Sequence, residues 1–103
     1  MVVTEIPISS AAAHFEQENE IFGQSFIFEF EWIDQESGWL LHIFDDSRNP
    51  AALGIKLQPQ WPLYTHHIGL DGIVFILIPT KPGPNLERHT LKTDFLLVAY
   101  EII

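Results

Sequence analysis

Carboxylate side chains alternate along two neighbouring segments of this sequence, and paired carboxylates are the groups that general acid–base catalysis uses. Glu16, Glu18 and Glu20 recur at every second position, and Glu29 and Glu31 repeat that spacing on the next segment. A glycoside hydrolase would need two such groups at a fixed separation in a cleft, one of them with a raised pKa. Regular alternation is instead typical of the solvent-facing side of a β-strand. We therefore interpret these glutamates as a solvated strand face.

Histidines raise the alternative of a metal site, and the chain has five of them: His14, His42, His66, His67 and His89. Adjacent histidines on an extended segment point in opposite directions, so His66 and His67 do not readily share one ion. No histidine pair has the four-residue spacing that places two ligands on one face of a helix. A site that includes His42 or Asp71 is the alternative, but we expect neither a metal nor a cofactor.

Nucleophilic catalysis lacks its usual local signatures in this chain. Ser9 and Ser10 lie among small residues, without the strand–turn–helix elbow that exposes a catalytic serine. The stretch GPNLER does not have the pattern of a phosphate-binding loop, and the chain contains no cysteine. We predict no catalytic residue and no enzyme activity; a cleft that gathers His66, His67 and Asp71 would be the exception.

Length and charge narrow the class of protein. A chain of 103 residues with 47% hydrophobic and 18% charged residues has the composition of one globular domain, so we expect a single β domain over residues 1–103. Its formal net charge of −9 disfavours contacts with phosphates, and we expect no sequence-specific binding of nucleic acid. The first residues lack the basic region of a signal peptide, and the apolar run IVFILI is far shorter than the roughly 20 residues that span a bilayer. We expect no export and no membrane association.

The elements that must position these side chains follow a period of two. In SFIFEFEWI the aromatic residues share one face and the glutamates share the other. The same reasoning predicts strands at about residues 3–8, 14–21, 25–33, 38–45, 51–57, 72–78 and 94–102. Helical spacing finds only a possible turn at about residues 9–13.

Short connections determine the architecture that we expect. The links between the first predicted strands are too short for a parallel crossover, so the first half should be an antiparallel meander. A single sheet would leave large aromatic side chains in water, so we predict an all-β antiparallel β-sandwich or partly open barrel of six to seven strands. Its interior should be filled by a set of bulky residues: Phe26, Phe28, Phe30, Trp32 and Trp39.

A long proline-rich loop, PTKPGPNLERHTLKT, occupies residues 79–93. Loops of this length are usually functional or disordered. The loop is either a mobile hairpin tip or an arm that orders on a partner, and its local positive charge favours an acidic partner surface. Lys81 and Arg88 are the contact residues that we expect in the second case.

A tryptophan between prolines lies in the stretch LGIKLQPQWPLY. Pro59 removes a backbone donor after a strand, and Pro62 restricts Trp61 to extended conformations. Trp61 either caps one end of the β core or, with Tyr64, anchors a neighbouring subunit, as rigid aromatic residues often do.

Five stretches follow one another in a characteristic order: IPISSAAAHFEQ, FGQSFIFEFEWID, GWLLHIFD, LGIKLQPQWPLY and LLVAYEI. In this order and spacing the chain resembles, over nearly its whole length, the small baseplate plug proteins of contractile-tailed phages of the cyanophage type. The turn DQESG and the loop at 79–93 match no pattern of that family, which leaves the partners of these loops undefined.

The resemblance implies a structural role in the virion, at the tail baseplate. Such proteins lie near the hub and spike and block the tube lumen until contraction, so hub, spike and tail-tube proteins are the expected partners, with several copies around the tail axis. The expected interface comprises Pro59, Trp61, Pro62, Tyr64, Lys81 and Arg88, and the segment at residues 2–8 is available to pair with the edge of a partner's sheet. The alternative is a small ligand-binding barrel or protein-interaction module unrelated to phages.

Overall fold

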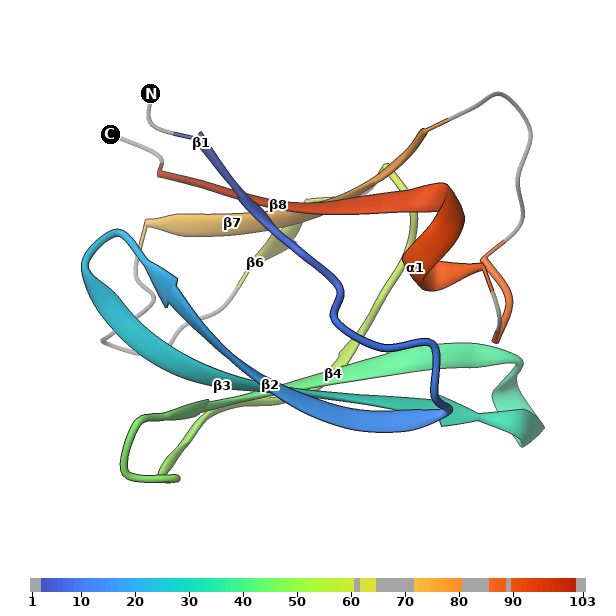
Figure 1. Ribbon diagram of the computed structural model, residues 1–103, viewed down its shortest axis with the longest axis horizontal. Helices are drawn as coiled ribbons and strands as arrows, with labels where there is room; N and C mark the ends of the chain where they lie inside the picture. Colours follow the sequence, from blue (N-terminus) through green and yellow to red (C-terminus); the bar gives the residue numbers. More distant parts are fainter. Residues whose placement is uncertain (1–2, 61, 65–71, 81–85, 89, 102–103) are drawn as a thin grey trace.

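Two four-stranded antiparallel sheets face each other in the computed structural model of the chain (Figure 1). The structure describes residues 3–60, 62–64, 72–80, 86–88 and 90–101. One sheet, here called the meander sheet, has the order β2 (His14–Ile21), β3 (Gln24–Ile33), β4 (Gly38–Asp45) and β5 (Pro50–Lys56). The other, the terminal sheet, has the order β1 (Val3–Ile6), β8 (Phe95–Glu101), β7 (Ile73–Pro79) and β6 (Leu63–Tyr64). Of the two predicted architectures, the chain adopts the sandwich.

The meander predicted for the first half is confirmed, since β2 to β5 are neighbours in chain order. Phe22 and Gly23 both have positive φ angles, of 50° and 85°, between the paired residues Ile21 and Gln24. Two central residues of this kind make the tight turn whose twist matches a β-hairpin. The next turn contains a short 3-10 helix, η1 (Asp34–Glu36).

The N-terminal strand is shorter than predicted, because β1 ends at Ile6 and not at residue 8. Pro7 has no N–H to continue the ladder, and its carbonyl accepts a hydrogen bond from Gln17 Nε2 at 2.6 Å. Gln17 Oε1 in turn accepts the N–H of Ser9. The segment therefore leaves the terminal sheet and is fixed to β2, and no helical turn forms at residues 9–13.

Two short elements were not predicted. β6 lies within the proline- and tryptophan-rich stretch, and the helix α1 (Leu91–Asp94) lies within the expected loop at 79–93. Leu91 is buried in the core, and Thr80 N–H donates to the carbonyl of Asp94 at 2.8 Å, which holds the two ends of the loop together. Among the described residues no helix is long and apolar enough to cross a membrane.

The interior between the sheets is filled with large side chains, as predicted. Phe28, Phe30 and Phe75 have no exposed surface, and Trp39 is almost fully buried. The rings of Phe28 and Phe75 meet edge to face with centroids 5.9 Å apart, which joins the two sheets. Trp32 is the member of the predicted set that stays half-buried, at the end of β3.

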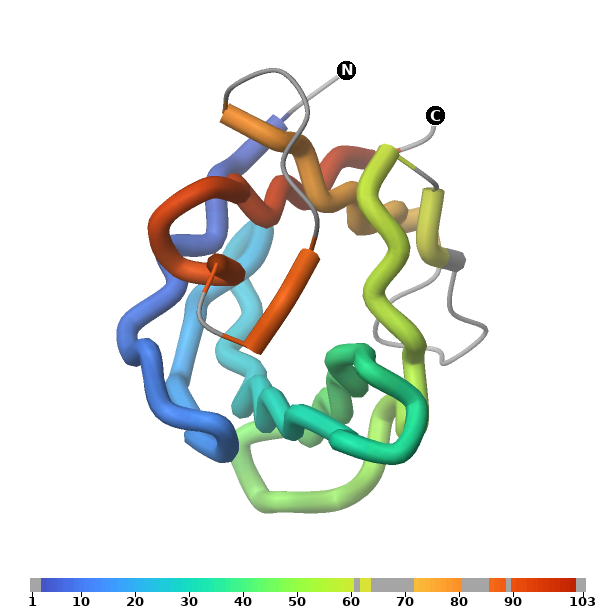
Figure 2. Tube along the Cα trace, turned by 90° about the vertical axis from the view of Figure 1, so that its right-hand side faces the viewer, coloured from blue at the N-terminus to red at the C-terminus, as the bar shows by residue number. Residues whose placement is uncertain are grey.

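Two crossing segments close opposite flanks of the sandwich (Figure 2). On one flank the chain descends from β1 to β2. On the other, residues 57–60 rise from the meander sheet to the terminal sheet. Leu57 N–H donates to the carbonyl of Trp39 at 3.0 Å, and Gln60 N–H donates to that of Leu77 at 2.8 Å. Backbone hydrogen bonds thus tie the second crossing to both sheets.

Candidate partner interface

The predicted interface residues are only partly described. Trp61 and Lys81 lie outside the described residues. Pro59 is half-buried and forms an isolated parallel bridge with Leu77, and Pro62 is exposed just before β6. Tyr64 belongs to β6, where its backbone pairs with Val74. These prolines and Tyr64 therefore line the β7 side of the terminal sheet.

Trp39 forms hydrogen bonds both with Leu57, beside the proline-rich stretch, and with residues 86–94, here called the arm. Its carbonyl accepts the N–H of Leu57, next to the proline-rich stretch. Its indole Nε1–H donates to the carbonyl of Glu87 at 3.0 Å. The two segments that the sequence predicts as partner contacts are therefore held by one buried residue, although they are about thirty positions apart in the chain.

Arg88 lies exposed beside a recess of about 380 Å³ at this end of the sandwich. The recess is lined by Trp32, Asp34, Ser37, Leu86, Glu87 and Arg88. Trp32 Nε1–H donates to Asp34 Oδ1 at 2.6 Å, and its ring meets that of Trp39 edge to face at 5.7 Å. The indole is thereby fixed while part of its surface remains open. An aromatic ring next to an exposed guanidinium is the combination that protein interfaces favour as an anchor.

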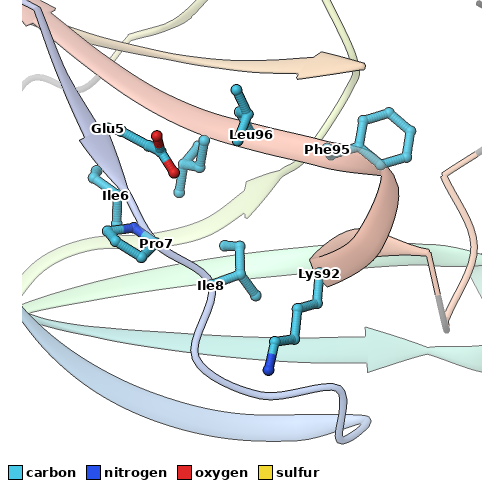
Figure 3. A pocket seen from close by; sticks show the side chains of 8 residues that line it. Glu5, Ile6, Pro7, Ile8, Lys92, Phe95 and Leu96 are labelled. Atoms are coloured by element: carbon cyan, nitrogen blue, oxygen red, sulfur yellow. The ribbon is translucent and has the colours of Figure 1, made fainter. Parts of the chain in front are cut away.

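A second, smaller recess of about 170 Å³ lies where β1 leaves β8 (Figure 3). Glu5, Pro7 and Ile8 form one side, and Leu96 belongs to the strand opposite. Lys92 extends from α1 beside Ile8. The recess exists because the ladder between the two strands stops at Ile6.

The outer side of the meander sheet, here called the acidic face, carries the alternating glutamates. Glu16, Glu18 and Glu20 are exposed on β2, as predicted. Glu16 lies directly opposite Glu29 on β3, an arrangement of like charges that destabilises a sheet. Arg48 offsets it by donating two hydrogen bonds to Glu16, at 3.2 and 3.3 Å.

His14 offsets the second charge of that pair by binding Glu29 Oε2 through Nε2. The hydrogen bond to Glu29, together with the negative charges of Glu29, Glu31 and Glu16, raises the pKa of His14 above its ordinary value of 6.5, against a smaller effect of burial. Glu16, Glu29 and Glu31 thus each lie beside a basic or histidine side chain on the outer side of the sheet.

His42 is bound by the protein through both ring nitrogens. Nδ1 accepts the N–H of Gly54 at 2.9 Å, so the ring proton is on Nε2, which lies 3.4 Å from Glu31 Oε1. Within the described ranges no three histidine or acidic side chains are grouped for a metal. His66, His67, His89 and Asp71 lie outside those ranges.

Sequence reasoning missed the outer side of the terminal sheet, here called the apolar face. Alternation along β1, β8 and β7 places eight side chains on this side: Val3, Glu5, Val74, Ile76, Ile78, Leu96, Val98 and Tyr100. Val74 is only 1% exposed, so the face is covered at that position. Val3, Leu96 and Ile78 are 56%, 39% and 38% exposed. The signal was in the sequence: an antiparallel strand with one face in water normally alternates, whereas GIVFILIP and DFLLVAYEII do not.

Comparison with known proteins gives one finding about the family. The family model described as "Cyanophage baseplate Pam3 plug gp18" matches residues 3–101, nearly the whole chain. No curated protein and no solved structure matches.

Proposed function

Because this chain belongs to the cyanophage baseplate plug family over residues 3–101, we propose that it closes or lines the lumen of a contractile tail tube, beside the hub and spike, until contraction. The match to the family carries this proposal. It covers every strand of both sheets, so the whole sandwich is the unit that the family shares. A position in the virion, at the tail baseplate, follows from the same membership.

The partners that we propose are the hub, spike and tail-tube proteins. Contact would be made by the proline-rich stretch, through Pro59, Trp61, Pro62 and Tyr64, and by the loop that carries Lys81 and Arg88. Support comes from the recess in which an open indole lies next to the exposed Arg88. Trp39 bonds both segments, so they would present one surface to a partner.

The strand β1 offers a second kind of contact. It borders the terminal sheet, and among the described strands its neighbour is β8. The N–H and C=O groups on its other side are those that a partner strand pairs with in β-augmentation. A hub sheet could therefore extend the terminal sheet by one strand.

The acidic face fits a position along a path for DNA. Its glutamates belong to a chain with a formal charge of −9, and a polyanion is repelled from such a surface. A plug with this face toward the lumen would hold no passing DNA. Several copies around the tube axis would line the path more completely than one.

We also place this protein outside the enzymes. The family is structural, Glu16 and Glu29 are each paired with a basic neighbour, and both ring nitrogens of His42 are in use. A ligand-binding barrel is the weaker alternative, because the space between the sheets is taken by Phe28, Phe30 and Phe75.

The test is the mass of the purified protein, alone and mixed with hub and spike proteins of the same phage, by size exclusion with light scattering. We expect a stable complex with the hub. Arg88→Glu should weaken it at least tenfold, whereas Arg48→Glu, in the turn between β4 and β5 at the other end of the meander sheet, should leave it unchanged. Trp61→Ala should either unfold the chain or leave it folded and defective in assembly. If the chain forms no complex with any tail protein, the plug proposal is overturned.

A further inference from the structure

The two outer sides of the sandwich differ sharply in polarity. The acidic face, at the bottom of Figure 1, carries five glutamates: Glu16, Glu18, Glu20, Glu29 and Glu31. The apolar face, at the top, carries a single charged side chain, Glu5, among its outward-pointing residues. Three of the four large hydrophobic side chains that are exposed in the described residues lie on this face. An apolar patch of this kind marks an interaction site.

The face has the side-chain composition of an inner sheet surface. β7 and β8 have seven residues each and are about 23 Å long, and with β1 they give a face of roughly 300 Å². Its side chains, such as Ile76 and Val98, are of the types that fill the space between packed sheets about 10 Å apart. Another apolar sheet surface is therefore a suitable partner for it.

We propose that the apolar face binds a second copy of this chain, face to face, about a two-fold axis parallel to β8. The distribution of charge on the two faces favours a second copy as the partner. A chain with a formal charge of −9 repels its own copies, and contact through this face turns both acidic faces away from each other. A basic partner would instead be drawn to the acidic face, since Glu5 is the one charge on the apolar face that could attract it.

The two-fold axis makes the face complementary to itself. It exchanges the β1 side and the β7 side of β8. Ile78 projects on the β7 side of Leu96, and the 170 Å³ recess lies on its β1 side. Each Ile78 is thereby brought to the recess side of the other copy, while the two Glu5 side chains stay at opposite borders of the contact. The arrangement brings each Ile78 to a recess that Ile8 and Leu96 line together with Glu5 and Lys92, and it keeps the two Glu5 side chains apart.

The small area of the apolar face predicts that the dimer is weak. A stable interface buries about 800 Å² on each partner, more than this face supplies. We expect a dimer that dissociates on dilution through roughly the micromolar range. Sedimentation velocity of the isolated protein, from about 1 to about 500 μM, should show the mass rising from one copy to two.

Variants identify the face that forms the contact. Ile78→Glu and Leu96→Glu should each weaken dimerisation at least tenfold, whereas Leu53→Glu, at a residue 59% exposed on the other sheet, should not change it. All three positions are exposed, so the fold should be retained, which circular dichroism checks. A chain that stays monomeric at every concentration, or a dimer unaffected by the first two variants, would overturn the proposal.

Single cysteines give an independent test, because the natural chain has none. Val98 lies on β8, beside the proposed axis, so Val98→Cys should form a disulfide-linked dimer on mild oxidation and Leu53→Cys should not. Equal cross-linking of the two variants would overturn the arrangement.

A hub complex lost in Ile78→Glu, with the chain alone monomeric, would assign the face to the hub instead. Since dimerisation is measured without tail proteins, its failure and that of the plug proposal are distinguishable.

Discussion

At the scale of single residues, the acidic face is maintained by specific pairs. Glu16 and Glu29 lie opposite each other, and each has its own basic neighbour, Arg48 or His14. Exposed ion pairs contribute little to stability. These pairs matter because they relieve a repulsion between the like charges of two adjacent strands. Their effect is best measured on the titrating partner.

We predict that His14 titrates above its ordinary pKa of 6.5, because its protonated ring is bound by Glu29 and attracted by Glu31 and Glu16. NMR titration of the imidazole protons measures this pKa directly. Glu29→Gln should lower it, and Glu20→Gln, which changes a glutamate farther along the same face, should leave it nearly unchanged. A His14 pKa that is the same with and without the Glu29 carboxylate would contradict the pairing.

The same pair gives stability a direction with pH. Since the folded pKa of His14 is raised, the contribution is fully present below 6.5, the unfolded value, and is lost as the pH rises through the folded pKa. His14 is 57% exposed, so the effect is small. Urea denaturation at several pH values should show that Glu29→Gln lowers the free energy of unfolding more below pH 6.5 than at pH values above the folded pKa of His14.

At the scale of elements, side-chain hydrogen bonds fix the segments that are not strands. Gln17, on the inner side of β2, donates to the carbonyl of Pro7 and accepts from Ser9 N–H. Trp39 holds the arm through Glu87. Each bond fastens irregular backbone that has no ladder of its own, so we expect local loosening when one of them is removed.

Gln17→Ala should therefore destabilise the protein by about 0.5–1.5 kcal/mol, since the exposed carbonyl of Pro7 and the exposed N–H of Ser9 lose their protein partner. Glu18→Ala, at the next position but on the outer face, is the matched control and should cost less than about 0.5 kcal/mol. Chemical denaturation measures both. Equal losses would show that the segment after β1 is held by other contacts.

Trp39→Phe removes the hydrogen bond to Glu87 and leaves a small cavity, which should cost about 2–4 kcal/mol. Its particular signature should be faster amide exchange in residues 86–94. Phe28→Leu is the control, because it also leaves a cavity in the core but removes no hydrogen bond to the arm; it should leave exchange in the arm unchanged. Equal acceleration in both variants would argue against Trp39 as the residue that holds the arm.

Seven of the eight strands could be predicted from the sequence, whereas the two-residue β6 and the course of the connections could not. Period-two patterns gave the bounds of β2 and β4 to the residue, because one face of each is buried and any shift would expose it. β1 was extended too far, since the effect of Gln17 on Pro7 depends on residues ten positions away. α1 was missed because four residues carry no periodic signal, and its burial through Leu91 is a tertiary effect.

Residue types predicted part of the candidate interface, but the sequence did not predict which residues the fold brings together there. Arg88 was expected at an interface and is exposed beside a recess, but Trp32, the aromatic residue next to it, was assigned to the core. Trp32 lies at the end of β3, where the alternation of buried and half-buried residues stops, so the sequence pattern does not show whether its side chain is buried. The apolar face was overlooked because continuous apolar runs such as GIVFILIP and DFLLVAYEII predict a strand without telling which of its faces meets water.

At the scale of the whole molecule, the sandwich has an acidic side and an apolar side. This asymmetry separates two tasks that a plug must perform: to be retained by neighbouring proteins and to leave DNA free. Contacts with protein would use the apolar face, the edge of β1 and the end near Arg88. The acidic face is then left toward solvent or toward the lumen, where its charge acts on DNA.

Reversing charges on that face should convert the protein into one that binds DNA. Glu18 and Glu20 are exposed on β2 and project from the acidic face, so Glu18→Lys with Glu20→Lys should retain the fold while changing the formal charge from −9 to −5, two units for each reversal. Because duplex affinity depends on local phosphate contacts and falls with salt, we expect fluorescence anisotropy to show binding of the variant at low salt that weakens as salt is added.

The neutral pair Glu18→Gln with Glu20→Gln separates charge from shape, and it should bind no DNA. In phage that carry the lysine variant, DNA ejection should slow while assembly is normal, since the partner surfaces are unchanged. Wild-type protein that binds duplex DNA in physiological salt would contradict this assignment, because the acidic face would then not keep DNA free. Slow ejection with the glutamine pair as well would trace the effect to altered packing and not to charge.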